Sequence, residues 1–229
     1  MSPTNRTRRL QVLLNPASQP RPFTVFKIGG SLFDLRDLPE VIERVLAQRP
    51  QSARLLVAGG GAAADIVRNW DEVHHLGQSA AHELALEAMD LAASLLARFL
   101  PDARLVRSEP QARLAASDGV LSILCAGCFI KAAESRGHAP LEQSWRITSD
   151  SIAAWTAGVL AADLVLVKSV PAPLDMTLAA AVRAGLVDEC FPALAARLPV
   201  VGWVNARDPD PVIETWQPGD TSSTANECE

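Results

Sequence analysis

The sequence predicts an α/β fold: a three-layer αβα sandwich built on a mostly parallel sheet. Short apolar runs alternate with amphipathic stretches along the chain, and glycine-rich turns follow the first two apolar runs. Strands that alternate with helices favour a parallel sheet covered by helices on both faces. Hydrophobic residues make up 48% of the 229 residues and charged residues 21%, which is typical of a folded, water-soluble protein.

Two strand–turn–helix units open the predicted domain. The apolar run at 23–28 ends at Gly29-Gly30-Ser31, and an amphipathic stretch follows at 38–47. A second buried-strand pattern at 54–58 ends at Gly59-Gly60-Gly61 and precedes helical residues at 62–70. This repetition predicts neighbouring strands that are each followed by a glycine turn and a helix.

The longest predicted helix covers 79–99, where apolar residues recur at helical spacing: Leu84, Ala88, Leu91, Leu95 and Phe99. Shorter strands are predicted at 103–106, 121–125, 163–168 and 200–205. Further helices are predicted from about 148 to 160, near 178–184 and near 191–197. The first of these has N-cap chemistry in Thr148-Ser149-Asp150-Ser151.

A single domain is predicted at 23–212, between a flexible N-terminal tail at 1–22 and a C-terminal tail at 213–229. The apolar run within the first 22 residues is too short for a signal sequence or a membrane span. The net charge of −5 and the pI near 5.4 argue against nucleic acid as a partner, because proteins that bind it usually carry a basic face. We expect a cytoplasmic protein with no membrane partner.

The cysteines give little support for metal or redox chemistry. Cys125 and Cys128 form the one close pair, and a zinc site normally needs a second pair of ligands. We therefore predict no metal site, and buried thiols on or beside a strand. The low cysteine count suits a reducing cytoplasm.

The two glycine-rich turns are candidate anion sites. Such a turn between a strand and a helix presents backbone N–H groups at the positive end of the helix. Ligands of an open parallel sheet bind at the carboxyl ends of its strands, so two turns could hold the two phosphate-bearing partners of a phosphoryl transfer. Neither turn has the P-loop spacing, and Gly59-Gly60-Gly61 lacks the dinucleotide fingerprint. The pair fits a kinase.

Two lysines and an aspartate are the candidate catalytic residues. Lys27 lies in an apolar strand, where a lysine needs an anionic partner, although a surface lysine at a strand end is the plainer alternative. Lys168 closes a second apolar strand in the same way. Asp150 could organise these cations around a transferring phosphoryl group, or could simply cap the helix that begins there.

Histidines are weaker candidates. His82 begins the long helix, and His74 and His75 lie in the preceding loop. A lone histidine is more often structural or solvated than catalytic, and these three form no metal-binding motif with a carboxylate.

The segments Lys27-Ile28-Gly29-Gly30-Ser31, Ala58-Gly59-Gly60-Gly61 and Thr148-Ser149-Asp150-Ser151 resemble, in order and spacing, the amino acid kinase superfamily. Three stretches at 80–91, 144–151 and 187–192 look like one branch of it, the aminomethylfuran-methanol phosphate kinases of methanofuran biosynthesis. The resemblance spans about 23–211. It implies a homo-oligomeric kinase that uses ATP and magnesium to convert a small phosphomonoester to a diphosphate.

The resemblance also implies roles for the candidate residues. Three residues would be catalytic, with the aspartate holding the lysine that bridges the phosphates: Lys27, Asp150 and Lys168. The nucleotide phosphates would be bound by Gly29, Gly30, Ser31, Lys168 and Ser169, the first two through backbone N–H groups. The acceptor would contact Gly59, Gly60, Gly61, His82, Thr148 and Ser149.

The sequence departs from the family pattern after the strand at 163–168. Members usually have Thr-Asp-Val-Asp-Gly and a nucleotide-binding loop there, whereas this sequence has Lys168-Ser169-Val170-Pro171-Ala172-Pro173. The later Gly-Met-x-x-Lys motif of several members is also absent. The rival hypothesis is therefore a non-catalytic member that binds a phosphate ligand as a sensor or as a subunit of a complex, although intact Lys27 and Asp150 favour an enzyme.

Overall fold

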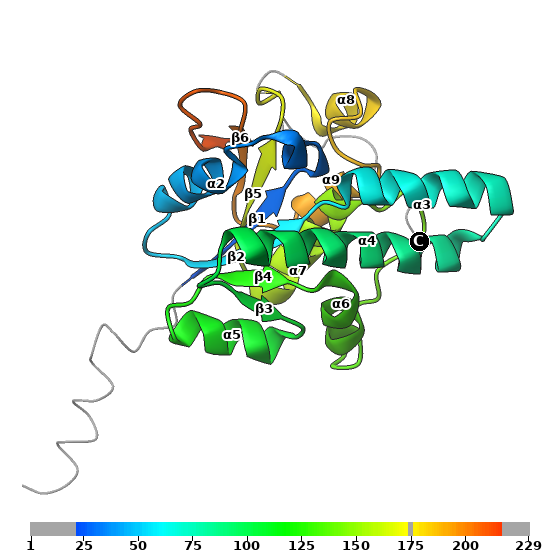
Figure 1. Cartoon of the computed structure of the whole chain (residues 1–229), viewed down its shortest axis with the longest axis horizontal. Helices are drawn as coiled ribbons and strands as arrows, with labels where there is room; N and C mark the ends of the chain where they lie inside the picture. The colour runs from blue at the N-terminus through cyan, green and yellow to red at the C-terminus, as the bar shows by residue number, and fades with distance from the viewer. Residues whose placement is uncertain (1–21, 174–175, 217–229) are drawn as a thin grey trace, which may run out of the picture.

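The computed structural model describes residues 22–173 and 176–216, and Figure 1 shows a central sheet with helices on both sides. The described strands form a 7-stranded sheet in the order β3-β4-β2-β1-β5-β6-β7. Their bounds are β1 (Phe23–Ile28), β2 (Ala53–Ala58), β3 (Arg104–Val106), β4 (Ser122–Leu124), β5 (Asp163–Lys168), β6 (Val201–Asn205) and β7 (Glu214–Thr215). All neighbours pair in parallel except β7, which is antiparallel to β6. The predicted α/β class with a mostly parallel sheet is confirmed.

The helices connect these strands. The bounds are η2 (Gly30–Asp34, a 3-10 helix), α2 (Leu38–Ala47), α3 (Gly61–His74), α4 (Gln78–Phe99), α5 (Glu109–Ser117), α6 (Ala126–Glu134), α7 (Ser149–Leu160), α8 (Leu178–Arg183) and α9 (Phe191–Ala195). The sequence did not predict α5 and α6. The start of α5 nevertheless has a helix signal, because Ser108 precedes it and Pro110 occupies its first turn.

Two hydrophobic clusters, one on each face of the sheet, hold the layers together. Phe26 and Ile28 of β1 pack with buried residues of η2, α2 and α4. Val25 of β1 instead packs with residues of α5, α7 and α9. Successive side chains of a strand point to opposite faces, so Lys27 lies on the same face as Val25, toward α7.

The pairing of β1 with β5 brings the two candidate lysines together. In this parallel pair Lys27 is opposite Leu166, and Ile28 is opposite Val167. Leu166 belongs to the cluster on the α7 side, so Lys168, two residues further on, leaves the sheet on that same side. Both lysines therefore reach the carboxyl ends of two adjacent central strands, beneath one helix.

The packed domain extends beyond the boundary predicted at residue 212. The Trp216 backbone N–H donates to the Val201 carbonyl at 2.8 Å, and its side chain is 1% exposed. Its ring lies edge-on to Trp203 and stacks with Phe191. The prediction of a tail from 213 onward is therefore wrong for 213–216, because β7 pairs with β6 and Trp216 fills core space; residues 1–21 and 217–229 lie outside the described residues.

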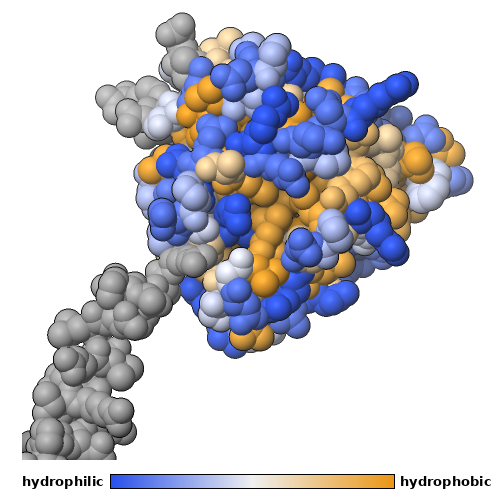
Figure 2. Space-filling model, turned by 60° about the vertical axis from the view of Figure 1, so that its left-hand side comes forward, coloured by the Kyte–Doolittle hydropathy of each residue, from blue (hydrophilic) through white to orange (hydrophobic). Residues whose placement is uncertain are grey.

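Helix α4 forms as predicted, but of its predicted apolar stripe Ala88 is buried while the three residues toward its C-terminal end are not. Leu91 is 64% exposed, and Leu95 and Phe99 are also exposed, whereas Leu86, Met89 and Leu96 are buried. Helix α3 packs against α4 and also exposes apolar side chains, those of Ile66, Trp70 and Val73. Figure 2 shows an area on one face of the molecule where hydrophobic side chains gather within a hydrophilic surround. The homo-oligomer stays a prediction.

Cys128 corrects the prediction of two buried thiols. Cys125 is buried at the end of β4, but Cys128 is exposed on α6, which begins directly after Cys125.

In the described ranges, no group of three or more His, Cys, Asp or Glu side chains could hold a metal ion. Likewise, no described helix combines the length and apolar character needed to cross a membrane.

Candidate active site

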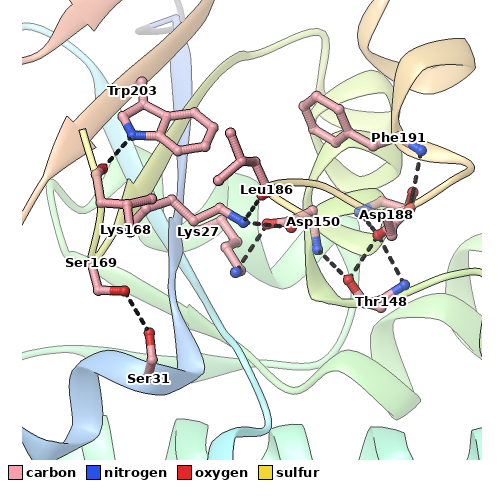
Figure 3. Close-up of polar contacts among 12 residues, drawn as sticks. Lys27, Ser31, Thr148, Asp150, Lys168, Ser169, Leu186, Asp188, Phe191 and Trp203 are labelled. Carbon is pink, nitrogen blue, oxygen red and sulfur yellow. Dashed lines mark hydrogen bonds and ion pairs between the residues drawn. The ribbon is translucent and has the colours of Figure 1, made fainter. Parts of the chain in front are cut away.

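A buried cluster of three charged side chains lies where β1, β5 and α7 meet (Figure 3). Asp150 in the first turn of α7 lies between the two lysines. Its Oδ1 is 2.9 Å from Lys27 Nζ, and its Oδ2 accepts a hydrogen bond of 2.6 Å from Lys168 Nζ. The exposed fractions of these side chains are 6% for Lys27, 7% for Asp150 and 13% for Lys168. The three predicted catalytic residues are thus in direct contact.

Lys168 has two further contacts that fix its ammonium group. Its Nζ donates to the backbone carbonyl of Leu186 at 2.8 Å. The same atom lies 5.6 Å from the centre of the Trp203 ring, within the range of a cation–π interaction. The lysine is therefore held on three sides by protein groups.

The cluster has a surplus of positive charge. Burial alone would raise the pKa of Asp150. The attraction of Lys27 and then of Lys168 together outweighs burial, so the pKa of Asp150 lies below its ordinary value. Burial, followed by repulsion from Lys27, lowers the pKa of Lys168 to about 8, although Asp150 opposes this shift. At neutral pH two ammonium groups thus share one carboxylate, and a buried site of this kind favours an anionic ligand.

Lysine titration tests this charge arrangement directly, because Lys27, Lys131 and Lys168 are all the lysines of the sequence. In a protein labelled with ¹³C-lysine, one side-chain signal should titrate near pH 8. The Lys168→Met variant should lack that signal. A spectrum in which every lysine titrates near the ordinary value of about 10.4 would contradict the arrangement.

A cavity of about 310 Å³ lies beside the glycine turns. The predicted residues that line it are Gly30, Ser31, Gly59, Gly60, Gly61, His82, Thr148 and Ser149. Lys27, Gly29, Asp150, Lys168 and Ser169 are not among the lining residues. The structure therefore brings every predicted acceptor residue to one cavity, with the charged cluster outside its lining.

The two glycine turns touch each other. A Cβ on Gly30 would lie 2.4 Å from the backbone nitrogen of Gly61, and a Cβ on Gly59 would lie 2.7 Å from that of Gly30. Gly61 also has a φ of +52°, in the region that side chains disfavour. Only glycines allow this approach, which places the starts of η2 and α3 side by side.

Hydrogen bonding limits which turn N–H groups can bind a ligand. Gly29 N donates to the Val167 carbonyl at 2.9 Å, and Gly59 N donates to the Ile28 carbonyl at 2.8 Å. Because the parallel ladders continue into the turns, the expectation that Gly29 donates to a nucleotide is wrong for this conformation. The N–H groups of Gly30, Gly60 and Gly61 make no backbone hydrogen bond within the described part of the chain.

The predicted nucleotide residues lie near the ends of β1 and β5. The hydroxyl oxygens of Ser31 and Ser169 are 3.0 Å apart, which ties the first turn to the loop after β5. This loop is held in turn by Trp203, whose Nε1 donates to the Val170 carbonyl at 2.9 Å.

His82 lines the cavity as a largely buried side chain, 6% exposed. Burial lowers the pKa of His82, although a hydrogen bond with the Ser144 backbone and nearby Glu83 oppose the shift. The lowered pKa favours the uncharged imidazole at neutral pH, so His82 can serve as a polar wall of the cavity.

The sequence reasoning missed an aromatic and basic wall of the cavity. Arg68 of α3 and Trp145 both line it, with the guanidinium carbon 5.2 Å from the centre of the indole ring. Trp145 Nε1 donates to Asp71 at 2.7 Å, and Arg68 also pairs with Asp65. Trp145 lies in the 144–151 stretch that carried the family resemblance, whereas nothing in the sequence marks Arg68 apart from other surface arginines.

A mostly parallel sheet between helices, with contacting glycine turns and a buried Lys–Asp–Lys cluster, defines an α/β protein whose site suits an anionic ligand. The chain belongs to the amino acid kinase family, whose model matches residues 22–172.

Similar proteins fit this assignment. The chain is 28% identical over 212 residues to the [5-(aminomethyl)furan-3-yl]methyl phosphate kinase of Methanocaldococcus jannaschii, covering 83% of this chain and 91% of that protein. Its fold is similar to that of the UMP kinase from Bacillus anthracis, with a TM-score of 0.56, 14% identity and coverage of 83% and 90% of the two chains. The aspartate kinase from Synechocystis has a TM-score of 0.57 at 14% identity, over 86% of this chain and 40% of that one.

Proposed function

We propose that this protein is an ATP-dependent kinase that converts a small phosphomonoester to a diphosphate. The observation that carries the proposal is the buried Lys27–Asp150–Lys168 cluster at the carboxyl ends of β1 and β5. Phosphoryl transfer depends mainly on positioning and on electrostatic stabilisation of the transferring group. Two lysines oriented by one buried carboxylate could supply both the positioning and the electrostatic stabilisation.

The cavity suits an acceptor that itself carries phosphate. Its lining includes Gly60 and Gly61 at the start of α3, whose N–H groups make no backbone hydrogen bond within the described ranges. Helix N-termini bind phosphate through backbone N–H groups and the helix dipole. Arg68 also lines the cavity, although it is paired with Asp65 of the same lining, and its guanidinium group could bind the phosphate of an acceptor.

The rest of the lining suits a flat, partly apolar acceptor. Leu86, Met89 and Ile152 contribute apolar surface, and the Trp145 indole offers a face on which a ring can stack. The relative from Methanocaldococcus jannaschii is named for a furan-methyl phosphate, which has both features. We therefore propose [5-(aminomethyl)furan-3-yl]methyl phosphate as the first acceptor to test.

ATP and magnesium fit the remaining part of the site. The ammonium groups of Lys27 and Lys168 and the N–H group of Gly30 suit the charge of a polyphosphate. Asp150 already binds both lysines, so magnesium would be held chiefly by the nucleotide phosphates, as is common for this ion. Bound magnesium would neutralise part of the phosphate charge.

In this mechanism the protein contributes orientation and charge, without a covalent intermediate. Lys27 and Lys168 would stabilise the transferring phosphoryl group, while Asp150 keeps both ammonium groups in place. The neutral His82 and the hydroxyl of Ser149 would orient the acceptor. The phosphate of the acceptor attacks in line with the leaving ADP.

Phosphorus NMR of the reaction tests this function. With ATP, magnesium and the furan-methyl phosphate, we expect paired diphosphate resonances from a new product. The corresponding unphosphorylated alcohol should react at least about a hundredfold less efficiently, because the charged groups of the cavity would lose their partner. Transfer to aspartate or acetylglutamate alone would contradict the phosphomonoester assignment.

Nucleotide binding is tested separately by thermal unfolding. A ligand at about a hundred times its dissociation constant stabilises the folded state by roughly 2.7 kcal/mol, which raises Tm by several degrees. We expect this shift with ATP and magnesium in the wild type and in Lys131→Ala, which changes an exposed lysine. Lys27→Ala should respond much less.

The departure of the loop after β5 from the family pattern keeps the non-catalytic rival worth testing. That rival predicts a thermal shift with a phosphate ligand but no diphosphate product with any acceptor. A clear shift with no turnover across phosphomonoester and carboxylate acceptors would favour it.

A further inference from the structure

We propose that Asp188 is a positioning residue that holds both Asp150 and Lys168 in their reactive arrangement. The proposal rests on the proposed kinase function and extends it to the short segment between α8 and α9. Asp188 does not line the cavity and does not contact the charged cluster. It acts through the elements that carry the cluster.

Asp188 binds the first turn of α7, as Figure 3 shows in part. Its Oδ2 accepts hydrogen bonds from Thr148 N at 3.0 Å, Thr148 Oγ1 at 2.8 Å and Ser151 N at 3.0 Å. The Ser151 hydroxyl donates to Oδ1. These donors flank Asp150 on both sides in the sequence, so the carboxylate of Asp188 fixes the turn from which Asp150 projects.

The same segment also holds Lys168. The carbonyl that accepts the hydrogen bond from Lys168 Nζ belongs to Leu186, two residues before Asp188. One short stretch of chain thus sets the position of the carboxylate through α7 and of the ammonium group through a direct hydrogen bond. A shift of this stretch would move the two charges relative to each other.

The segment is anchored in the core. Asp188 Oδ1 also accepts from Cys190 N at 3.2 Å and from Phe191 N at 3.0 Å, at the start of α9. Phe191 is fully buried and stacks with Trp216. The position of α7 is therefore tied through Asp188 to the buried aromatic pair of Phe191 and Trp216.

Both side-chain oxygens of Asp188 act as hydrogen-bond acceptors in this environment. Every group that contacts Asp188 in these hydrogen bonds is an N–H or O–H donor. An asparagine would turn its own N–H₂ toward donors on one side, although its shape is nearly unchanged. Asp188→Asn should therefore loosen the first turn of α7 without creating a cavity.

The kinetic test compares Asp188→Asn with Glu189→Gln. A misplacement of about 1 Å can lower a rate by about a hundredfold, so kcat should fall by roughly 10-fold to 100-fold while KM for ATP changes little. Glu189 is the neighbouring carboxylate and pairs with Arg146 at the surface, so Glu189→Gln should keep the wild-type kcat. If Asp188→Asn alters KM alone, Asp188 affects binding instead of the reactive arrangement.

The lysine titration provides a test that needs no activity. Within the described ranges, the charged side chains in contact with Lys168 are Asp150 of α7 and Lys27 of β1, with the Trp203 ring of β6 beside it. Asp150 raises the pKa of Lys168, so a loosened Asp150 should move the Lys168 titration to lower pH in Asp188→Asn and not in Glu189→Gln.

An unchanged titration in folded Asp188→Asn overturns the proposal, whether or not the wild type shows turnover. A wild type without turnover would count against the kinase function alone. Should Asp188→Asn fail to fold, Ser151→Ala removes one donor from the same contact and should shift the titration in the same direction.

Discussion

Asp150→Asn is expected to lower turnover by at least about a hundredfold, the scale seen when one preorganised electrostatic contact is removed. The variant should also be destabilised, because it leaves the ammonium groups of Lys27 and Lys168 buried without their shared counter-charge. Breaking a buried ion pair from one side typically costs about 3–5 kcal/mol. Chemical denaturation and a steady-state assay measure the two effects separately.

A second substitution separates the role of Asp150 in stability from its role in transfer. Asp150→Asn combined with Lys168→Met removes one of the unpaired charges, so this double variant should be more stable than Asp150→Asn alone. Its turnover should remain at the low level. If Asp150→Asn retains its specific activity although it unfolds readily, Asp150 is a structural helix-end residue and the catalytic proposal is wrong.

Gly30→Ala is expected to abolish the thermal shift with ATP and magnesium and to destabilise the protein. The new methyl group would lie 2.4 Å from Gly61 N and 2.6 Å from Gly61 Cα, so the two turns would have to separate. Overpacking of this kind typically costs about 1–3 kcal/mol. Unfolding curves with and without nucleotide measure both effects.

Gly158→Ala is the matched control. Gly158 lies within α7, and a Cβ there would meet no atom within 4 Å apart from the nearby backbone of its own helix. An alanine inside a helix is favoured over glycine by roughly 0.5–1 kcal/mol, so this variant should be slightly stabilised and should keep its response to nucleotide. A Gly30→Ala protein that behaves in the same way would show that the contact between the turns is not required.

The sequence predicted the central strands well because their signals are local. The strands β1 and β5 have the predicted bounds, since each is an apolar run buried on both faces of the sheet. The buried side of α4 could not be predicted from such local signals. Its stripe of Leu91, Leu95 and Phe99 is as periodic as a core-facing stripe, and only the packing of α3 and the sheet decides which side is covered.

In the candidate site, too, the sequence predicted the residues with a local signal and missed those that depend on distant contacts. A lysine in an apolar strand and an aspartate at a helix start are visible in the sequence, and the strand order then brings Lys27, Asp150 and Lys168 into contact. Asp188 binds groups that are 37 and 40 residues away in the chain. No local pattern reports such a contact, so its function becomes apparent only after α7 and α9 have been placed.

The central position of β1 has a consequence for the order in which the chain folds. Among the described strands β1 comes first in the chain and can pair with β2 soon after synthesis, but its other neighbour, β5, is synthesised only after α7. Until then Lys27 lacks both Asp150 and the cover of α7, and burying a lone ammonium group is unfavourable. Burial of Lys27 therefore requires both α7 and β5, so contacts at the centre of the sheet link the first strands of the domain to elements more than 100 residues later in the chain.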